Sequence, residues 1–218
     1  MSEHIQAAGR DPARIAGLIL AAGAGSRFGG GKMRARLDGR SLVAHVLAAA
    51  RAAHLGRLVL VLGADAGAVR ADLLATDPAA FEGVLVAVNP AAGRGLATSL
   101  RLGLAAATAE PRPDGVLILL GDQPRIRPAT LAALLAAPAP ADAIAVVADH
   151  ADDQAPNPVL LLWPRGAVLL GELGGDRGLG PLLAAHPERV VRIPVAGANP
   201  DIDSPVDLAA LEGSPRAD

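Results

Sequence analysis

The feature that most constrains this chain is an apolar run followed at once by a glycine-rich, basic loop. Residues 15–21 read Ile-Ala-Gly-Leu-Ile-Leu-Ala and have no polar face. Such a run predicts a strand covered on both sides, as in a parallel sheet. The next residues, 23–31, are rich in glycine, which lets a backbone approach a ligand closely and present N–H groups to an anion. Because Arg27 and Lys32 add positive charge, this loop is a candidate binding site for a phosphate chain.

Two common phosphate-binding motifs do not describe this loop. In the P-loop pattern, Ser26 stands where the first glycine belongs, and Met33 follows the lysine. The dinucleotide pattern G-x-G-x-x-G fits Gly23 and Gly25 but ends on Phe28, and the next helical pattern begins only near residue 41. The sequence therefore predicts a long basic loop of a third type between a first strand and a first helix. The alternative is a flexible glycine-rich surface loop.

Length and composition bound the class of protein. A chain of 218 residues suits one α/β domain, and 51% hydrophobic residues exclude a disordered chain. Aromatic residues make up only 1%, so Ala, Leu and Val must form the core, and a net charge of −2 without tyrosine argues against a nucleic-acid-binding surface. The absence of cysteine excludes disulfides and thiolate sites. The N-terminus lacks the apolar core of a signal peptide and no apolar run could span a bilayer, so we expect a cytoplasmic protein.

Strand and helix patterns alternate through the first two thirds of the chain. This alternation is typical of right-handed βαβ units around a parallel sheet. Beyond residue 150 the pattern loosens, and we expect a loose lead-in over residues 1–14 and a frayed tail from residue 214. The predicted strands are 15–21, 57–62, 84–88, 116–120, 143–147, 159–162 and 190–195. The predicted helices are 41–53, 66–76, 95–107, one that Pro128 opens, and 165–173.

Asp122 directly follows the apolar strand predicted at 116–120. Ligands of open α/β sheets bind at the carboxyl ends of the strands. A carboxylate beside a phosphate chain would repel it unless a divalent cation stands between them, and oxygen ligands of this kind suit Mg²⁺. The alternative is that Asp122 only stabilises the following turn, which is a common use of an aspartate after a strand.

Three further acids lie near the C-terminus. Ser204, Pro205 and Asp207 have the spacing of a helix start, with an N-cap, a proline at the first position and an acid at the third. Asp201 and Asp203 precede the cap on one side of an extended stretch, because alternate residues share a face. We interpret Asp207 as a structural residue and Asp201 as part of a polar turn.

The stretch from Asn89 to Leu100 combines a strand end, a glycine turn and a helix N-terminus. Helix N-termini are donor-rich and carry a partial positive charge. Thr98 and Ser99 could hydrogen-bond a base or a ribose, or instead the backbone of their own helix.

These motifs resemble those of the MobA-like nucleotidyltransferases, in the same order along residues 15–211. Residues 20–32 match L-A-A-G-x-G-x-R-x-G-x-x-K, and residues 89–100 match N-P-x-x-x-x-G-x-x-x-S-L. Residues 121–124, G-D-Q-P, resemble the metal-binding strand end of the cytidylyltransferase branch, and residues 201–207, D-I-D-x-P-x-D, resemble the family's C-terminal motif. The closest branch is the molybdenum cofactor cytidylyltransferases.

The resemblance implies a fold and an activity. The fold would be a single α/β domain over residues 15–213, a three-layer α/β/α sandwich around a mostly parallel, Rossmann-like (GT-A-like) sheet. Residues 15–150 would bind NTP and residues 151–213 the acceptor. The reaction would join CMP from CTP to the phosphate of a pterin cofactor and release pyrophosphate, with Mg²⁺ as cofactor. A molybdoenzyme or its chaperone would be the protein partner, with no role for nucleic acid or membrane. The alternatives are a guanylyltransferase or sugar-phosphate nucleotidyltransferase and, in a different class, a non-catalytic nucleotide- or cofactor-binding chaperone.

The resemblance also assigns site residues. Catalytic roles fall to Arg27, Lys32 and Asp122, and metal binding to Asp122 and Asp203. Acceptor binding falls to Gln123, Asn157, Asp176 and Arg177, although Asn157 replaces a histidine of the family's pattern. The expected nucleotide-binding residues are Leu20, Ala21, Ala22, Gly23, Ala24, Gly25, Ser26, Arg27, Lys32, Ala64, Asn89, Ser99, Leu100, Gly121 and Asp122.

Overall fold

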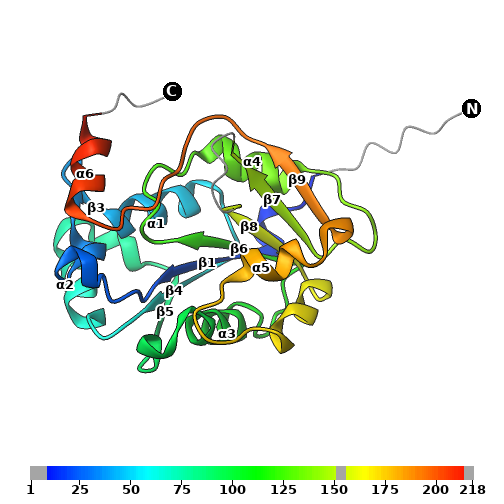
Figure 1. Ribbon diagram of the computed structural model, residues 1–218, viewed down its shortest axis with the longest axis horizontal. Helices are drawn as coiled ribbons and strands as arrows, with labels where there is room; N and C mark the ends of the chain where they lie inside the picture. The colour runs from blue at the N-terminus through cyan, green and yellow to red at the C-terminus, as the bar shows by residue number, and fades with distance from the viewer. Residues whose placement is uncertain (1–8, 151–155, 214–218) are drawn as a thin grey trace, which may run out of the picture.

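A seven-stranded sheet forms the centre of the molecule (Figure 1). The computed structural model describes residues 9–150 and 156–213. The strand order is β5-β4-β1-β6-β8-β7-β9. Strands β5, β4, β1 and β6 pair in parallel, β8 is antiparallel to both neighbours, and β7 pairs with β9 in parallel. The predicted, mostly parallel sheet is therefore confirmed. The strands are β1 (Ile15–Ala21), β4 (Arg57–Leu62), β5 (Val84–Val88), β6 (Gly115–Leu120), β7 (Ala145–Asp149), β8 (Val159–Leu162) and β9 (Val190–Pro194).

Helices cover both faces of this sheet and give the predicted three layers. On one face, α1, α2 and α4 bury apolar side chains such as Val46, Val69 and Leu134 in one core cluster with Ile19 and Leu60. On the other face, α3 and α5 pack in a second cluster with alternate residues of the same strands, and Figure 1 shows α3 lying across that face. The helices are α1 (Leu42–Ala52), α2 (Ala66–Thr76), α3 (Leu96–Ala107), α4 (Pro128–Ala136), α5 (Leu179–Ala184) and α6 (Pro205–Glu212).

The predicted elements differ from the observed ones mainly after residue 140. Strand β7 begins two residues later than predicted, and the segment predicted as a helix at 165–173 forms a 3-10 helix, Arg165–Gly171. Helix α5 was not predicted. Its one turn and a half contains Gly180 and Pro181, which hide the helical spacing of Leu179, Leu182 and Leu183.

The C-terminal segment packs on the loop that follows β1. Ile202 is buried with Leu37 and Leu42, and Phe28 and Leu208 pack against this small cluster. Between β1 and α1 the chain also forms two short 3-10 turns, Ser26–Phe28 and Lys32–Arg34, and a hairpin of β2 (Arg36–Leu37) and β3 (Arg40–Ser41). This packing places the acids of residues 201–203 beside the basic loop, although nearly the whole chain separates them in sequence.

The chain ends are only partly described. Within residues 9–14, Pro12–Arg14 forms a 3-10 turn, and Arg10 donates hydrogen bonds to the carbonyls of Leu135 and Ala137. The rest of the expected lead-in, residues 1–8, and the expected tail from residue 214 lie outside the described residues. In the part of the chain that is described, none of the helices has the length and apolar character needed to cross a membrane.

Candidate active site

A cleft of about 380 Å³ opens at the carboxyl ends of β1 and β6. This volume is in the range of small-molecule sites, and the place is the one where open α/β sheets bind ligands. The walls come from the loop after β1, the start of α3, the end of β6, the loop before α5 and the segment before α6. The lining residues are Leu20, Ala22, Gly23, Ala24, Met33, Ala92, Gly93, Gly95, Leu96, Ser99, Leu120, Asp122, Asp176, Asp201 and Asp203.

Lys32 joins the two predicted metal ligands. Its ammonium Nζ lies 2.7 Å from Asp122 Oδ2 and 2.7 Å from Asp203 Oδ1, which are the distances of charge-assisted hydrogen bonds. The side chain of Lys32 is buried, whereas Asp122 is half-buried and Asp203 is exposed to the cleft. The prediction that Asp122 and Asp203 reach one place is therefore confirmed.

The charge of Lys32 is stabilised by these two acids. Burial alone would lower the pKa of Lys32, but the charges of Asp122 and Asp203 and the hydrogen bonds to them outweigh burial and raise the pKa. Lys32 is therefore a fixed positive charge at neutral pH. A buried cation held between two carboxylates shows that this position suits a cation.

Backbone contacts hold the two acids in place. The N–H of Ile202 donates to the carbonyl of Asp122 over 3.0 Å, so the segment before α6 is tied to the end of β6. Asp207 Oδ2 accepts hydrogen bonds from the N–H groups of Asp203 and Ser204, and Ser204 Oγ accepts from the N–H of Asp207. These hydrogen bonds from Ser204 and Asp203 lower the pKa of Asp207. The predicted helix start at Ser204 is thus a complete capping box.

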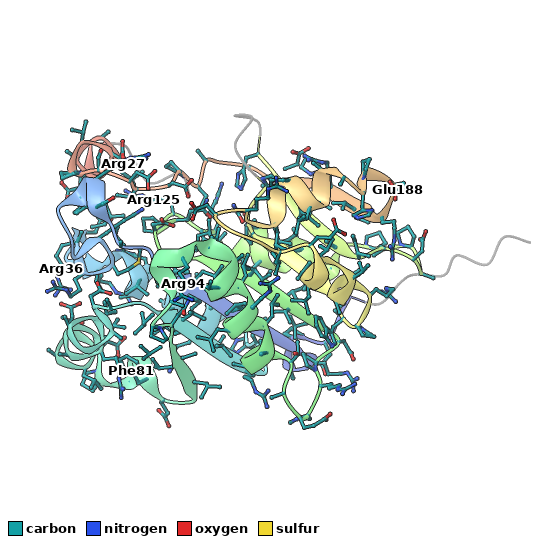
Figure 2. The ribbon with its side chains drawn as sticks, turned by 60° about the horizontal axis from the view of Figure 1, so that its bottom comes forward. Arg27, Arg36, Phe81, Arg94, Arg125 and Glu188 are labelled. Carbon is teal, nitrogen blue, oxygen red and sulfur yellow. The ribbon has the colours of Figure 1, made fainter. Side chains whose placement is uncertain are left out.

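The loop after β1 wraps around Lys32. Gly25 has a φ of +57°, and a Cβ there would lie 2.8 Å from the Cβ of Lys32, so only glycine fits beside this lysine. The N–H groups of Phe28, Gly29 and Gly30 are bonded within the loop. Arg27 is exposed (Figure 2). Its Nη1 lies 3.4 Å from Asp203 Oδ2. The side chain of Arg27 is thus placed at the rim, where it can turn toward a bound anion.

Most of the nucleotide-binding residues predicted in the stretch from Asn89 to Leu100 make contacts within the protein rather than facing the cleft. Asn89 is buried, and its Nδ2 donates to the hydroxyls of Thr98 and Ser99 while its Oδ1 accepts from the N–H of Ala91. Thr98 Oγ1 donates to the carbonyl of Gly95. Asn89 therefore shapes the loop, and only Ser99 among the expected residues of this stretch lines the cleft. Leu100 lies in the core.

Asp201 lies in the cleft, and its interpretation as part of a polar turn is wrong. Its Oδ1 accepts a hydrogen bond of 3.0 Å from Gln123 Nε2, and Gln123 Oε1 accepts one of 3.2 Å from Asn199 Nδ2. Desolvation of the carboxyl and the charges of Asp122 and Asp203 raise the pKa of Asp201, and the hydrogen bond from Gln123 opposes this rise. The residue was misread because sequence spacing places Asp201 and Asp203 on one face but does not show what that face meets.

The expected acceptor residues occupy different places. Asp176 lines the cleft from the loop of residues 174–178, and Arg177 in the same loop is exposed. Gln123 is buried, with both ends of its amide bonded to Asp201 and Asn199. Asn157 precedes β8, at the same edge of the sheet, and its carbonyl lies 2.9 Å from His150 Nε2.

The loop of residues 174–178 is docked on the N-terminus of α3. The N–H of Ala97 donates to the carbonyl of Gly175 over 3.1 Å. Gly95 has a φ of +115°, and a Cβ at this position would lie only 2.3 Å from that carbonyl oxygen. The two walls of the cleft are therefore in direct contact, and glycine is required where they meet.

The donor set at Lys32 fits Mg²⁺ held jointly by protein and substrate. Within residues 9–150 and 156–213, no set of three or more His, Asp or Glu side chains is arranged to hold a metal ion by itself. Mg²⁺ usually binds one or two carboxylates and completes its coordination with water and substrate phosphates. Asp122 and Asp203, which already share one cation, supply such a pair.

Comparison with known proteins gives relatives over nearly the whole chain. A crystal structure of Rv0371c from Mycobacterium tuberculosis H37Rv is 31% identical, with a TM-score of 0.75, and the alignment covers 95% of this chain and 99% of that one. A second structure of Rv0371c, in complex with manganese, is 30% identical with a TM-score of 0.71, covering 92% and 98%.

Among curated proteins, the bifunctional protein GlmU of Azorhizobium caulinodans is 36% identical over 132 residues, which are 60% of this chain and 28% of GlmU. The chain spans only about a quarter of the length of the curated relatives that it matches. The sequence profile of the MobA-like NTP transferase domain matches residues 17–190. With the motifs, the fold and this match in agreement, the chain belongs to the MobA-like NTP transferase family.

Proposed function

We propose that this protein is a Mg²⁺-dependent cytidylyltransferase that moves CMP from CTP to the phosphate of a pterin cofactor and releases pyrophosphate. One observation carries the proposal: the side chains of Lys32, Asp122 and Asp203 meet at one point of the cleft beside the glycine-rich loop. A relative of 30% identity has been crystallised in complex with manganese, which supports a divalent cation for this protein too. We also propose that the protein acts in the cytoplasm.

The residues of the cleft act by holding charges rather than by covalent attack. An anionic phosphate must attack the α-phosphorus of an anionic triphosphate, so the protein must align the two and neutralise charge. The backbone of residues 23–26 cradles the triphosphate, Arg27 turns from the rim onto its outer phosphates, and Lys32 contacts the α-phosphate. Asp122 and Asp203 would hold Mg²⁺, which when bound neutralises developing charge on the phosphates.

The choice of CTP over GTP rests on Ala22. This residue is buried in the wall of the cleft, where the resemblance puts a glycine in guanylyltransferases. Its methyl group narrows the space that a larger purine would need. Steric discrimination of this kind is worth about 1–3 kcal/mol, so CTP should be preferred by roughly ten- to two-hundred-fold in kcat/KM.

The decisive experiment incubates the protein with Mg²⁺, Mo-molybdopterin and each of the four NTPs, and measures pyrophosphate release. We expect release with CTP and much less with GTP. Equal kcat/KM for CTP and GTP would contradict the assignment of the base, and release only with a sugar phosphate in place of the pterin would contradict the acceptor. Binding of CTP without pyrophosphate release from any acceptor would favour a nucleotide-binding chaperone.

A further inference from the structure

A third carboxylate, that of Asp201, lies in the cleft beside the two predicted metal ligands. The N–H of Ile202 is bonded to the backbone of Asp122, and the Ile202 side chain is buried on the far side. Alternate residues of an extended segment share a face, so Asp201 and Asp203, the residues directly before and after Ile202, both face the cleft. The position of Asp201 is therefore fixed by the same contact that places Asp203.

Two buried amides orient the carboxylate of Asp201. Gln123 and Asn199 are 5% and 4% exposed, and a buried amide is costly unless its hydrogen bonds are made. Both ends of the Gln123 amide are bonded, whereas Asn199 uses its Nδ2 and its Oδ1 has no partner among the described residues. Asn199 Nδ2 donates to Gln123 Oε1, and this bond turns the Gln123 Nε2 donor toward Asp201 Oδ1. Both ends of the Gln123 amide are thus bonded within the protein, and burial leaves little of this amide open to an acceptor molecule. Gln123 is thus arranged to hold Asp201.

A carboxylate fixed at this point repels the other anions of the cleft unless a cation is near it. The triphosphate, Asp122 and Asp203 are all anionic, and an additional negative charge within a few ångströms repels each of them. The two carboxylates that Lys32 contacts are those of Asp122 and Asp203, and Asp201 meets the Gln123 amide instead. Mg²⁺ keeps several of its waters in protein sites, and carboxylates in the next layer orient the direct ligands and strengthen metal binding.

We propose that Asp201, positioned by Gln123 and Asn199, is an outer carboxylate of the metal site that hydrogen-bonds the hydration shell of the cation held by Asp122 and Asp203. The inference rests on the proposed function only in requiring that the cleft takes a divalent cation together with an NTP. It gives Gln123 a positioning role in place of the direct acceptor contact expected from the resemblance.

The test measures two affinities of the folded, full-length protein with opposite expected changes. Binding of Mn²⁺ alone is followed by electron paramagnetic resonance, and binding of CTP without metal by calorimetry. Asp201→Asn should weaken Mn²⁺ binding by about tenfold or more. The same change should strengthen metal-free CTP binding, because one charge that repels the triphosphate is removed. A variant that merely misfolds would lose both.

Gln123→Met separates position from charge. This variant keeps the Asp201 carboxylate and removes the Gln123 amide, that is, the N–H that holds Asp201 and the oxygen that accepts from Asn199. Mn²⁺ binding should therefore weaken by a smaller factor while metal-free CTP binding is nearly unchanged. Glu188→Gln is the matched control for the loss of one negative charge, because Glu188 is exposed and lies at the far end of the molecule from Arg27 (Figure 2). It should change neither affinity.

The outcomes distinguish this inference from the proposed function. In an Asp201→Asn variant that thermal unfolding shows to be folded, an unchanged Mn²⁺ affinity, or a lowering of both affinities, would overturn the role of Asp201 while leaving the cytidylyltransferase proposal in place. Gln123→Met with unchanged Mn²⁺ affinity would overturn the positioning role of Gln123. A wild-type protein that binds neither Mn²⁺ nor CTP with Mg²⁺ would overturn the proposed function and this inference with it.

Discussion

The Lys32 ammonium donates a hydrogen bond of 2.7 Å to Asp122, the acid at the end of β6. The same ammonium donates a second hydrogen bond, also of 2.7 Å, to Asp203. Lys32 therefore occupies the position that a divalent cation would share with these two acids. If a metal enters with the nucleotide, the ammonium must leave the carboxylates, and the α-phosphate of the incoming NTP offers it a new anionic partner.

Lys32→Met is predicted to strengthen the binding of Mn²⁺ to the nucleotide-free protein and to lower kcat. The variant removes the ammonium that competes with a metal ion for Asp122 and Asp203. It also removes the positive charge that would contact the α-phosphate. A loss of about 10²–10³ in kcat is reasonable for one such electrostatic contact. Electron paramagnetic resonance of Mn²⁺ and steady-state kinetics with CTP measure the two effects.

Two results would contradict this view of Lys32. Weaker Mn²⁺ binding in Lys32→Met would show that the lysine supports the metal rather than competing with it. A higher KM with unchanged kcat would show that Lys32 contributes only uniform binding of the substrate.

Asp122→Asn is predicted to abolish Mg²⁺-dependent turnover, and Asp203→Asn to lower it less. Both replacements keep an amide oxygen that can still ligate Mg²⁺. The loss should be larger at Asp122 because it is the more enclosed of the two acids and its charge is less screened by water, whereas Asp203 is exposed. Both variants should fold, because each side chain reaches the cleft rather than the core. Turnover measured against Mg²⁺ concentration gives the ranking of the two variants. If Asp203→Asn is the more damaging, the assignment of Asp122 as the main metal ligand is wrong.

Asp207→Asn is predicted to lower stability slightly and to leave activity nearly intact. The Asp207 carboxylate accepts three hydrogen bonds at the start of α6, and these lower its pKa. Its contribution to stability is therefore present above the ordinary carboxyl pKa and is lost as the pH falls through the lowered value. Thermal unfolding of both proteins from pH 7 to pH 2 should show a difference that disappears in acid. A large loss of turnover at pH 7 would instead make Asp207 a functional acid.

Much of the fold and part of the site follow from the sequence. Strand β1 is an uninterrupted apolar run, and β4 is one from Leu58 onward, and their predicted bounds agree with the structure. The spacing of Ser204 and Asp207 lets each side chain accept a hydrogen bond from the backbone N–H of the other, and the predicted helix start is confirmed as a capping box. Local spacing cannot show which distant segments meet. The contact of Lys32 with Asp203 depends on Ile202 packing beside Leu37, and the hydrogen bond from Gln123 to Asp201 joins residues 78 positions apart.

Gly95→Ala is predicted to destabilise the protein and to disturb the acceptor side of the cleft. The backbone at Gly95 has a φ that side chains rarely adopt, and a methyl group would collide with the Gly175 carbonyl. The strain alone costs about 1–3 kcal/mol. Chemical denaturation should show this loss, whereas Gly93→Ala, where a Cβ meets nothing within 4 Å, should be nearly neutral in stability. Equal stability of the two variants would contradict the required contact between α3 and the loop of residues 174–178.

The most direct test of the central claim is the affinity for CTP with and without Mg²⁺, measured by calorimetry for the wild-type protein and for Asp122→Asn. A cation shared by Asp122, Asp203 and the triphosphate predicts that Mg²⁺ strengthens CTP binding to the wild type by roughly tenfold or more, as expected for a metal that bridges protein and nucleotide. In Asp122→Asn this dependence on Mg²⁺ should largely disappear. A CTP affinity that is the same with and without Mg²⁺ in the wild type, or a Mg²⁺ effect that survives in Asp122→Asn, would contradict the assignment of this cleft as a metal-dependent nucleotide site.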